Sequence, residues 1–197
     1  MVSTTVYALV SVLIVSMLSL IGLITLSFND KLLKNILLYL VSFAAGGLLG
    51  DSFVHLFPEA VEKIGFSVML SFYVLLGIVV SFVIEKVIQW RHCHHEEHIH
   101  PFAVMNLFGD GVHNFIDGLI IGGSYLVSIP LGIATTIAVI FHEIPQEVGD
   151  FGILLQGGFS KAKALFFNFI TASLAIIGTI IALVLNVYIE KLDLFLV

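Results

Sequence analysis

The sequence is poor in several residue types, and each shortage excludes a class of protein. Only one of the 197 residues is cysteine, Cys93, so an intrachain disulfide cannot form and the redox compartment cannot be inferred. Eight Lys and Arg residues stand against 14 Asp and Glu, which argues against a nucleic-acid-binding surface and leaves no nucleic-acid partner to expect. Charged residues make up 11% of the chain, against roughly 25% in soluble domains. These shortages exclude an ordinary soluble domain and a disordered chain.

The chain is instead rich in apolar residues. They make up 59% of the chain, and the mean hydropathy is +1.11. One bilayer crossing takes about 20 apolar residues, so several crossings fit this length. Backbone groups in lipid need internal partners and no alternating barrel pattern is present, so we expect helices. The predicted spans are Thr5–Phe28, Asn35–Phe57, Phe66–Ile88, Phe102–Leu126, Pro130–Gln156 and Ala164–Ile189. The predicted fold class is therefore an all-α, polytopic membrane protein of six transmembrane helices, with residues 1–197 as a single transmembrane domain.

The basic residues are divided unequally between the two sides of the predicted spans. The side reached after spans one, three and five holds Lys31, Lys34, Lys86, Arg91, Lys161 and Lys163, and the other side holds Lys63 and Lys191. Basic loops stay in the cytoplasm, so we expect an extracytoplasmic N-terminus and a cytoplasmic loop at 91–101, in the plasma (inner) membrane. Residues 1–4 carry no basic group, which argues against a signal peptide, and the first span is expected to be retained.

Three of the spans carry a narrow polar stripe on an otherwise apolar helix. An α-helix turns by about 100° per residue, so the spacing of the polar residues in each span places their side chains on one face of the helix. The stripes are Asp51, His55 and Glu59; Asp110, His113, Asn114 and Asp117; and His142, Glu143, Gln146, Glu147 and Asp150. Ionisable groups within a bilayer usually mark an ion pathway, and the alternative is a polar network that joins helices. Imidazole with carboxylate suits zinc, iron or manganese, and the absence of sulfur ligands disfavours Cu(I).

Two sequence runs resemble signatures of a known membrane family. His113–Gly118, with the sequence HNFIDG, resembles the fourth-helix signature of the ZIP family of divalent metal transporters. His142–Glu147, with the sequence HEIPQE, resembles the fifth-helix signature in its histidine-rich subfamily. His55–Ala60 is similar to the ending of the second helix, and Gly158–Asn168 to the start of the sixth. Pro145 lies within the fifth span and can kink it, either to expose a carbonyl to a wet cavity or only for packing.

The resemblance implies a binuclear metal site between the fourth and fifth helices. The ligands that it implies are His113, Asn114, Asp117, His142, Glu143 and Gln146, with Glu147 beside them. It also implies metal uptake towards the cytoplasm, with zinc as the first substrate and Fe²⁺, Mn²⁺ or Cd²⁺ as alternatives, and no organic cofactor. Further side chains are expected to line the pathway or a secondary metal site, or else to join helices: Asp51, His55, Glu59, Asp110, Asp150 and Asn168. Glu59 and Glu62 could attract cations or be ordinary loop charges.

Two departures from the family pattern affect these expectations. Gln146 stands where the histidine-rich subfamily usually has His, and a neutral amide oxygen is a weaker zinc ligand. The family usually has eight helices, whereas six are predicted here. The alternatives at this point are a fragment, a shortened homologue, or a chain that completes itself as a homodimer. A non-transporting metal sensor and an intramembrane metalloprotease are rival functions, but the HExxH zinc motif of the latter fails at Gln146.

The loop between the third and fourth spans is rich in histidine. It contains His92, Cys93, His94, His95, His98 and His100. Dense imidazole with a thiol binds zinc or similar ions, although the fixed spacing of a zinc finger is missing. We expect either a flexible metal collector at the cytoplasmic exit or a solvated loop that only separates two spans.

Overall fold

Helices make up every regular element in the part of the chain that the structure describes. The computed structural model describes residues 2–22, 35, 38–39, 42–43, 46–47, 49–92 and 99–195, without the side chains of 2–3, 51, 55–56, 59, 88–92 and 187–195. The α-helices are α1 (Val2–Met17), α4 (Phe57–Ile64), α5 (Val68–His92), α6 (Pro101–Val127), α7 (Ile129–Gln156), α8 (Lys161–Ala172) and α9 (Leu174–Phe195). A 3₁₀ turn η1 (Leu18–Ile21) follows α1, and a π-helical turn η2 (Asp51–Leu56) precedes α4. The predicted all-α class is confirmed.

Within the described residues, four helical stretches are long and apolar enough to cross a membrane. They are Thr4–Ile21, Val68–Val87, Ile129–Gln156 and Lys161–Asn186, which match the predicted spans one, three, five and six. Helix α6 matches the predicted fourth span but is not among the four, because its polar stripe lowers its mean hydropathy. Much of the second span lies outside the described residues. The chain is thus a polytopic membrane protein, and the count of six spans stays a prediction.

The predicted sixth span consists of two helices. Helix α8 ends at Ala172 and α9 begins at Leu174, with Ser173 between them. The Ser173 hydroxyl donates a hydrogen bond to the carbonyl of Phe169, 2.7 Å away. A serine that bonds the carbonyl four residues earlier tends to bend a helix, which accounts for the break at this residue.

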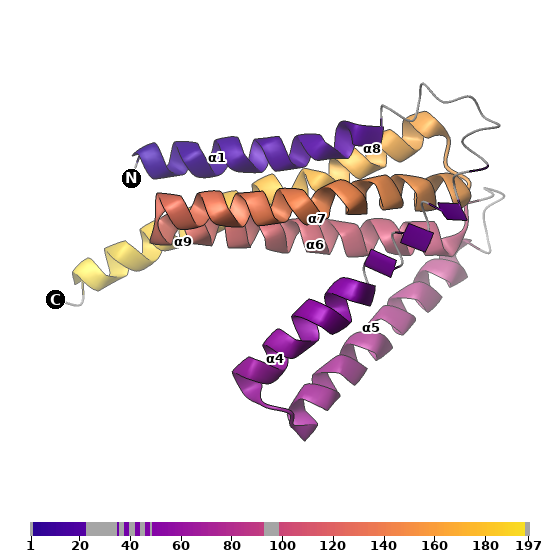
Figure 1. The fold of residues 1–197 in the computed structure, drawn as a ribbon, viewed down its shortest axis with the longest axis horizontal. Helices are drawn as coiled ribbons and strands as arrows, with labels where there is room; N and C mark the ends of the chain where they lie inside the picture. The colour runs from indigo at the N-terminus through magenta and orange to yellow at the C-terminus, as the bar shows by residue number, and fades with distance from the viewer. Residues whose placement is uncertain are drawn as a thin grey trace.

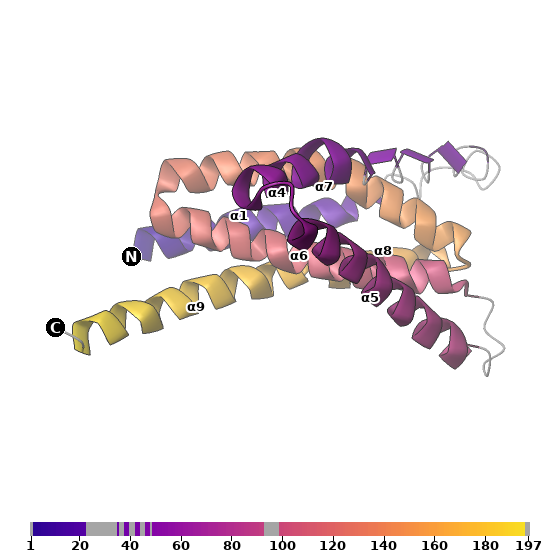
Figure 2. The same ribbon diagram turned by 90° about the horizontal axis from the view of Figure 1, so that it is seen from below.

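Helix α6 is the centre of a bundle that runs along the long axis of the molecule. It contacts α1, α5, α7, α8 and α9, and Figure 1 shows α1, α6, α7 and α9 lying lengthwise beside one another. The start of α1 and the end of α9 lie at the same end of this bundle (Figure 1). Helices α4 and α5 form a hairpin that diverges from the bundle in Figure 1, whereas in Figure 2 it overlaps the bundle and only the end of α5 extends beyond it. The hairpin is largely exposed, and only 6% of the α5 window is buried.

Glycines let α6 and α9 approach at backbone distance. A Cβ atom at Gly118 would overlap the carbonyl of Ala175, and one at Gly178 would overlap the carbonyl of Phe115. The Thr179 hydroxyl also donates a 2.8 Å hydrogen bond to the Gly118 carbonyl. Small residues have this role in transmembrane helix packing, as the Gly118–Gly122 spacing predicts. At the other such pair, Gly46 and Gly50, a Cβ would meet no atom of the described chain within 4 Å.

A glycine turn connects α7 to α8 and sets their relative positions. Gly158 has a φ of +95°, which glycine adopts without steric cost. The Phe159 amide donates to the Leu154 carbonyl at 3.0 Å and the Gly158 amide donates to the Leu155 carbonyl at 3.2 Å, the bonding pattern of a Schellman cap. Ser160 then caps the start of α8, because its hydroxyl accepts a hydrogen bond from the Lys163 amide. The turn places α8 beside the second half of α7.

Two apolar clusters bracket the polar part of the bundle. One contains Ala8, Val15, Ile121, Tyr125, Val139 and Leu183, and the other contains Ala103, Phe151, Leu154, Phe159, Ala164 and Leu165. Along α6, the first cluster follows the polar stripe and the second precedes it. Along α7 the order is reversed, because the two helices are antiparallel. The polar side chains therefore occupy a layer in the middle of the bundle, with an apolar layer on either side.

Candidate metal centre

Polar side chains of α6 and α7 face each other in a series of cross-helix pairs. The pairs are Asn106–Asp150, Asp110–Gln146, His113–Glu143 and Asp117–His142, with atoms 2.9, 3.4, 3.4 and 2.9 Å apart. We call these eight residues the polar ladder. Each step towards the start of α6 is matched by a step towards the end of α7, as expected for antiparallel helices whose stripes turn towards each other.

Four ladder residues at one end form a compact set of metal ligands. His113, Asp117, His142 and Glu143 offer ligand atoms that all lie within 4.8 Å of one another. The Nε2 atom of His113 is 3.6 Å from Asp117 Oδ2 and 3.4 Å from Glu143 Oε1. The Nε2 atom of His142 is 2.9 Å and 3.8 Å from the same two oxygens. Zinc bonds of about 2.05 Å give a tetrahedral edge of roughly 3.3 Å, so the four distances bracket the edge of a zinc tetrahedron.

The buried polar atoms of this ligand set cost free energy when no cation is bound. Glu143 is fully buried and both of its carboxylate oxygens have no hydrogen-bond partner among the described residues. The Nε2 atom of His113 is likewise buried without a hydrogen bond. A buried polar atom without a partner costs about 1–3 kcal/mol, and more when it is charged. Two imidazoles and two carboxylates also match the ligand chemistry of a borderline divalent metal.

The remaining residues of the implied site lie beside the compact set rather than in it. The Asn114 side-chain amide donates to Asp110 Oδ1 at 2.8 Å. The Gln146 amide makes a longer bond, 3.4 Å, to the same oxygen. Glu147 turns towards α8, where Asn168 donates a short hydrogen bond to it. The structure thus brings Asp110, Asn114 and Gln146 together one turn from the compact set, and pairs Glu147 with Asn168.

The ladder also contains a residue that the sequence analysis did not identify. The Asn106 amide donates a 2.9 Å hydrogen bond to Asp150 Oδ1. Asn106 lies four residues before Asp110, so it continues the polar stripe of α6 by one helical turn. That spacing was the available signal.

Other predicted residues lie outside this centre or outside the described part of the chain. The side chains of Asp51, His55 and Glu59 are not described, so the role of the second stripe stays a prediction. The loop side chains at His92, His94, His95 and His98 are not described either. His100 is exposed at the start of α6, where its ring stacks on Phe102 with centroids 5.6 Å apart. Glu62 is exposed on α4.

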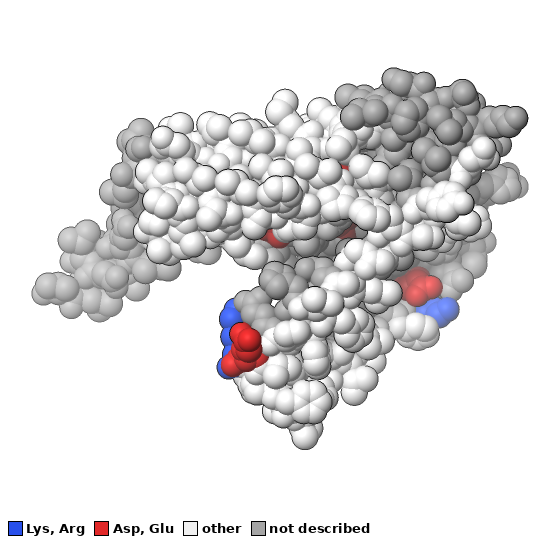
Figure 3. Space-filling view, viewed as in Figure 1, with Lys and Arg blue, Asp and Glu red and all other residues white. Residues whose placement is uncertain are grey.

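The compact set is open on one side of the bundle. The side chain of His142 is 44% exposed and that of His113 is 34% exposed, whereas Asp117 and Glu143 are buried behind them. In Figure 3, a few acidic atoms are visible in the hollow between the bundle and the α4–α5 hairpin, and charged atoms of both signs are visible on the hairpin.

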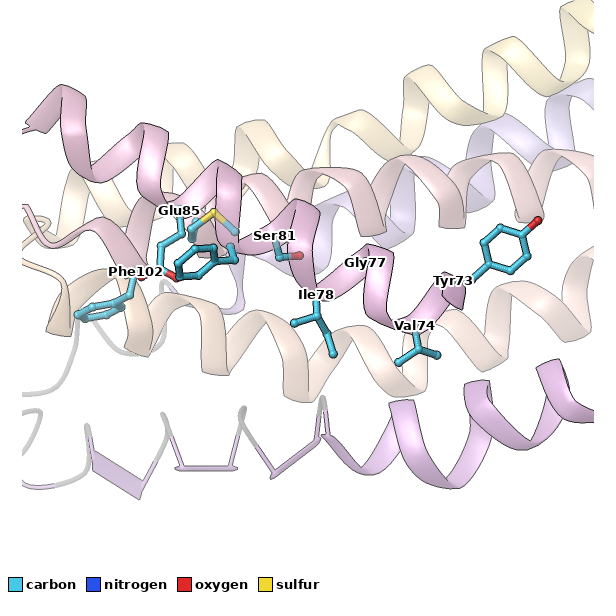
Figure 4. Close-up of a pocket in the computed structure, with 9 residues that line it drawn as sticks. Tyr73, Val74, Gly77, Ile78, Ser81, Glu85 and Phe102 are labelled. Carbon is cyan, nitrogen blue, oxygen red and sulfur yellow. The ribbon is translucent and has the colours of Figure 1, made fainter. Parts of the chain in front are cut away.

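A second hollow has a different character. It lies between α5 and α6 and is lined mostly by apolar side chains, including Tyr73, Ile78 and Phe102 (Figure 4). Glu85 is its one acidic lining residue. One carboxylate among aromatic and aliphatic groups does not supply a set of metal ligands, so this groove is no competing metal centre.

The amino-acid sequence is similar to the sequences of several known proteins. The chain is 32% identical to "Zinc transporter zipt-7.1" of Caenorhabditis briggsae over 206 residues, covering 75% of this chain and 53% of that protein. It is 32% identical to "Zinc transporter YKE4" of Saccharomyces cerevisiae over 168 residues, covering 75% and 49%. It is 50% identical to "IAA-alanine resistance protein 1" of Arabidopsis thaliana over 84 residues, covering 42% and 18%.

The comparisons also define the extent of the similarity. The chain spans about half the length of most of the curated relatives that it matches. No solved structure matches it. The profile of the family described as "ZIP Zinc transporter" matches residues 2–101 and 91–193, which together cover nearly the whole sequence. With both helix signatures inside these matches and their histidines and carboxylates gathered between α6 and α7, the chain belongs to the ZIP zinc transporter family.

Proposed function

We propose that this protein moves divalent metal cations across a membrane, with zinc as the first substrate. The observation that carries the proposal is the four-ligand set of His113, Asp117, His142 and Glu143 within 4.8 Å. It lies inside a bundle that has helices long enough to cross a bilayer. The names of the similar proteins support zinc, and Fe²⁺, Mn²⁺ and Cd²⁺ are alternatives that the same ligand types accept.

The path begins, on this proposal, in the hollow beside the α4–α5 hairpin. A hydrated cation meets the half-exposed imidazoles of His113 and His142, exchanges water for these nitrogens, and is then neutralised by Asp117 and Glu143. Asn114 and Gln146, which both bond Asp110, would supply the second position of a binuclear centre, with Glu147 beside them. Their oxygens are weaker zinc ligands than imidazole, and a transported ion has to leave as well as enter.

The proposed direction of transport is the uptake that the family resemblance implies, and the basic residues supply the proposed orientation of the chain. With the N-terminus outside and the loop 91–101 in the cytoplasm of a plasma (inner) membrane, metal would move inwards and leave near the histidine-rich loop. The loop histidines would collect the metal at the exit, and the stripe of Asp51, His55 and Glu59 would line the route. The chain would carry this activity as one transmembrane domain over residues 1–197, alone or as a homodimer within the lipid bilayer.

Transport and sensing differ in one measurable quantity, which is flux. The test uses purified protein in vesicles with a zinc-sensitive dye inside. We expect zinc influx in the wild type and loss of influx in His113→Ala and Glu143→Ala. Glu85→Gln changes an exposed carboxylate on α5 and serves as the control with wild-type influx. If both substitutions at the metal centre leave influx unchanged, the proposal is wrong, and zinc binding without influx would identify a sensor.

Proteolysis is the weaker alternative. The second histidine of an HExxH motif is replaced by Gln146, which bonds Asp110 instead. The family match also describes transporters.

A further inference from the structure

The groove between α5 and α6 is a built feature that the metal centre does not use. Its volume is about 720 Å³, and small-molecule sites occupy roughly 300–1,000 Å³. The lining residues of α5 recur at intervals of three and four, so they share one face of the helix: Tyr73, Val74, Gly77, Ile78, Ser81, Phe82 and Glu85. Phe102 and Met105 line the groove from the first turns of α6. Figure 4 shows the α5 residues following one side of the helix, with Phe102 at the Glu85 end.

Two small residues on α5 create the hollow. A Cβ atom at Gly77 would meet no atom of the described chain within 4 Å. Ser81, one turn further along, adds only a hydroxymethyl group. The larger lining groups Tyr73, Ile78 and Phe102 are between 45% and 60% exposed. The groove therefore offers apolar and aromatic surface to a ligand on both helices.

The dimensions of the groove distinguish between two possible occupants. Glu85 lies twelve residues after Tyr73, which is about 18 Å along the helix axis. One leaflet contributes roughly 15 Å to a hydrocarbon core of about 30 Å. A further α-helix, 10–12 Å wide, would occupy roughly 1,400 Å³ or more over the same length, about twice the volume of the groove. The groove thus suits a lipid acyl chain and is too small for another helix.

Charged groups of both signs stand at one end of the groove. Glu85 is its acidic lining residue, and Lys86 follows directly in the last turn of the apolar stretch Val68–Val87. The Lys86 ammonium lies 5.3 Å from the ring centroid of Phe82, which also lines the groove. Charged side chains at the end of a transmembrane stretch reach the depth of the lipid headgroups. A carboxylate beside an ammonium complements a headgroup that itself carries an ammonium and a phosphate.

We propose that the α5–α6 groove binds one phospholipid with a zwitterionic amine headgroup. One acyl chain lies along Gly77 and Ile78 and against Phe102. The Glu85 carboxylate accepts hydrogen bonds from the headgroup ammonium, and the Lys86 ammonium pairs with the phosphate. Because the chain covers apolar groups of both helices, the bound lipid joins the α4–α5 hairpin to the bundle. None of these residues belongs to the polar ladder, so the lipid site does not rest on the proposed transport function.

Lipid binding in zinc-free detergent solution tests the site directly. The probes are dioleoyl phosphatidylethanolamine and dioleoyl phosphatidylglycerol, which share their acyl chains but differ in the headgroup. Native mass spectrometry of the purified, delipidated full chain counts the bound lipids and gives a dissociation constant for each. Gly77→Leu fills the groove. Gly123→Leu on α6 is its matched control, because a Cβ there also meets no atom of the described chain within 4 Å and Gly123 does not line the groove. Glu85→Gln removes the negative charge and keeps the apolar surface.

We expect one phosphatidylethanolamine per chain, bound about 10-fold more tightly than phosphatidylglycerol. Gly77→Leu should weaken the binding of both lipids about 10-fold, and Gly123→Leu should retain it. Glu85→Gln should bind the two lipids with similar affinity. Unfolding midpoints in lipid-free detergent check that each variant is folded. Wild-type lipid affinity in folded Gly77→Leu, tighter binding of phosphatidylglycerol by the wild type, or a headgroup preference that survives Glu85→Gln overturns the proposal. Zinc binding needs no residue of the groove, so loss of zinc influx would count against the transport proposal alone.

Discussion

Helix α5 and the α6–α7 pair are all largely apolar in sequence, but they differ in what they bury. Helix α5 is exposed along nearly all of its described length, and Leu70 is its one buried apolar residue in that length. Helices α6 and α7 bury acidic and amide groups against each other, and the two imidazoles beside these groups are partly exposed. Mean hydropathy identifies α5 as a helix that can span a membrane, but it does not identify α6 as one. Apolarity therefore shows where the chain can meet lipid, whereas the polar residues that lower it show where helices meet one another and where ions bind.

The largest expected difference between the two regions is in the loss of stability when a glycine is replaced. Gly118→Leu places a side chain into the carbonyl of Ala175, and backbone overlap cannot be relieved by a rotamer change. We expect the free energy of unfolding to fall by more than about 3 kcal/mol. Gly77→Leu on α5 meets no atom of the described chain within 4 Å and should leave stability unchanged or slightly higher. Thermal unfolding in detergent measures both, and equal midpoints would show that α6 and α9 do not pack as described.

Zinc should stabilise the protein through α6 and α7 and not through α5. At a zinc concentration of 100 times the dissociation constant, binding to the folded state adds about 2.7 kcal/mol. Glu143→Gln removes a buried ligand candidate and should abolish this gain at the same zinc concentration. Glu85→Gln makes the same chemical change on α5 and should retain it. A gain that survives Glu143→Gln would place the principal zinc site elsewhere in the chain.

A histidine added to the ladder should tighten zinc binding. Gln146→His replaces a weak amide ligand by imidazole at the position where the related subfamily usually has His. We expect the dissociation constant for zinc to fall about 10-fold, or roughly 1.4 kcal/mol. Ser81→His adds the same group to α5, where one acidic residue lines the groove, and should change the affinity much less. Isothermal titration with zinc compares the two, and a similar gain from both would indicate nonspecific imidazole binding.

The smallest contrast concerns a single hydroxyl. Thr179→Val removes the 2.8 Å hydrogen bond to the Gly118 carbonyl while it keeps the side-chain shape. We expect a loss of about 1 kcal/mol in the free energy of unfolding. Ser81→Ala removes an exposed hydroxyl from α5 and should have no measurable effect. The same unfolding experiment distinguishes them, and a Thr179→Val protein as stable as wild type would mean that water replaces the lost bond.

The helices that carry the site could be predicted from sequence almost to the residue. The expected spans Phe102–Leu126 and Pro130–Gln156 compare with α6 at Pro101–Val127 and α7 at Ile129–Gln156. Local signals fix these ends, because Pro starts a helix and the glycine at 157 ends one. The division at Ser173 was not predicted, since the sequence around it remains apolar and a serine within a helix need not bend it.

The sequence predicts which helix face carries each candidate ligand, but it does not predict which residues contact one another. The fifth-span stripe groups Glu143 and Glu147 together, yet Glu143 lies against α6 and Glu147 bonds Asn168 of α8. A polar face about 140° wide contacts two neighbouring helices, and only their arrangement decides which residue meets which. Asn106 could have been assigned to the polar face of α6 from its spacing to Asp110, but its partner could not. Its importance comes from the register of α6 against α7, which pairs it with Asp150.

The glycine contact between α6 and α9 limits how the centre can change shape. Two helices in backbone contact cannot rotate or slide past each other without steric overlap, so α6 and α9 behave as one rigid body. The backbone positions of the α6 ligands are then fixed in the frame of α9, so a backbone motion that separates His113 from Glu143 is a shift of α7 relative to α6 and α9. If ion loading or release involves a helix motion, we expect it to be a displacement of α7 relative to the α6–α9 unit.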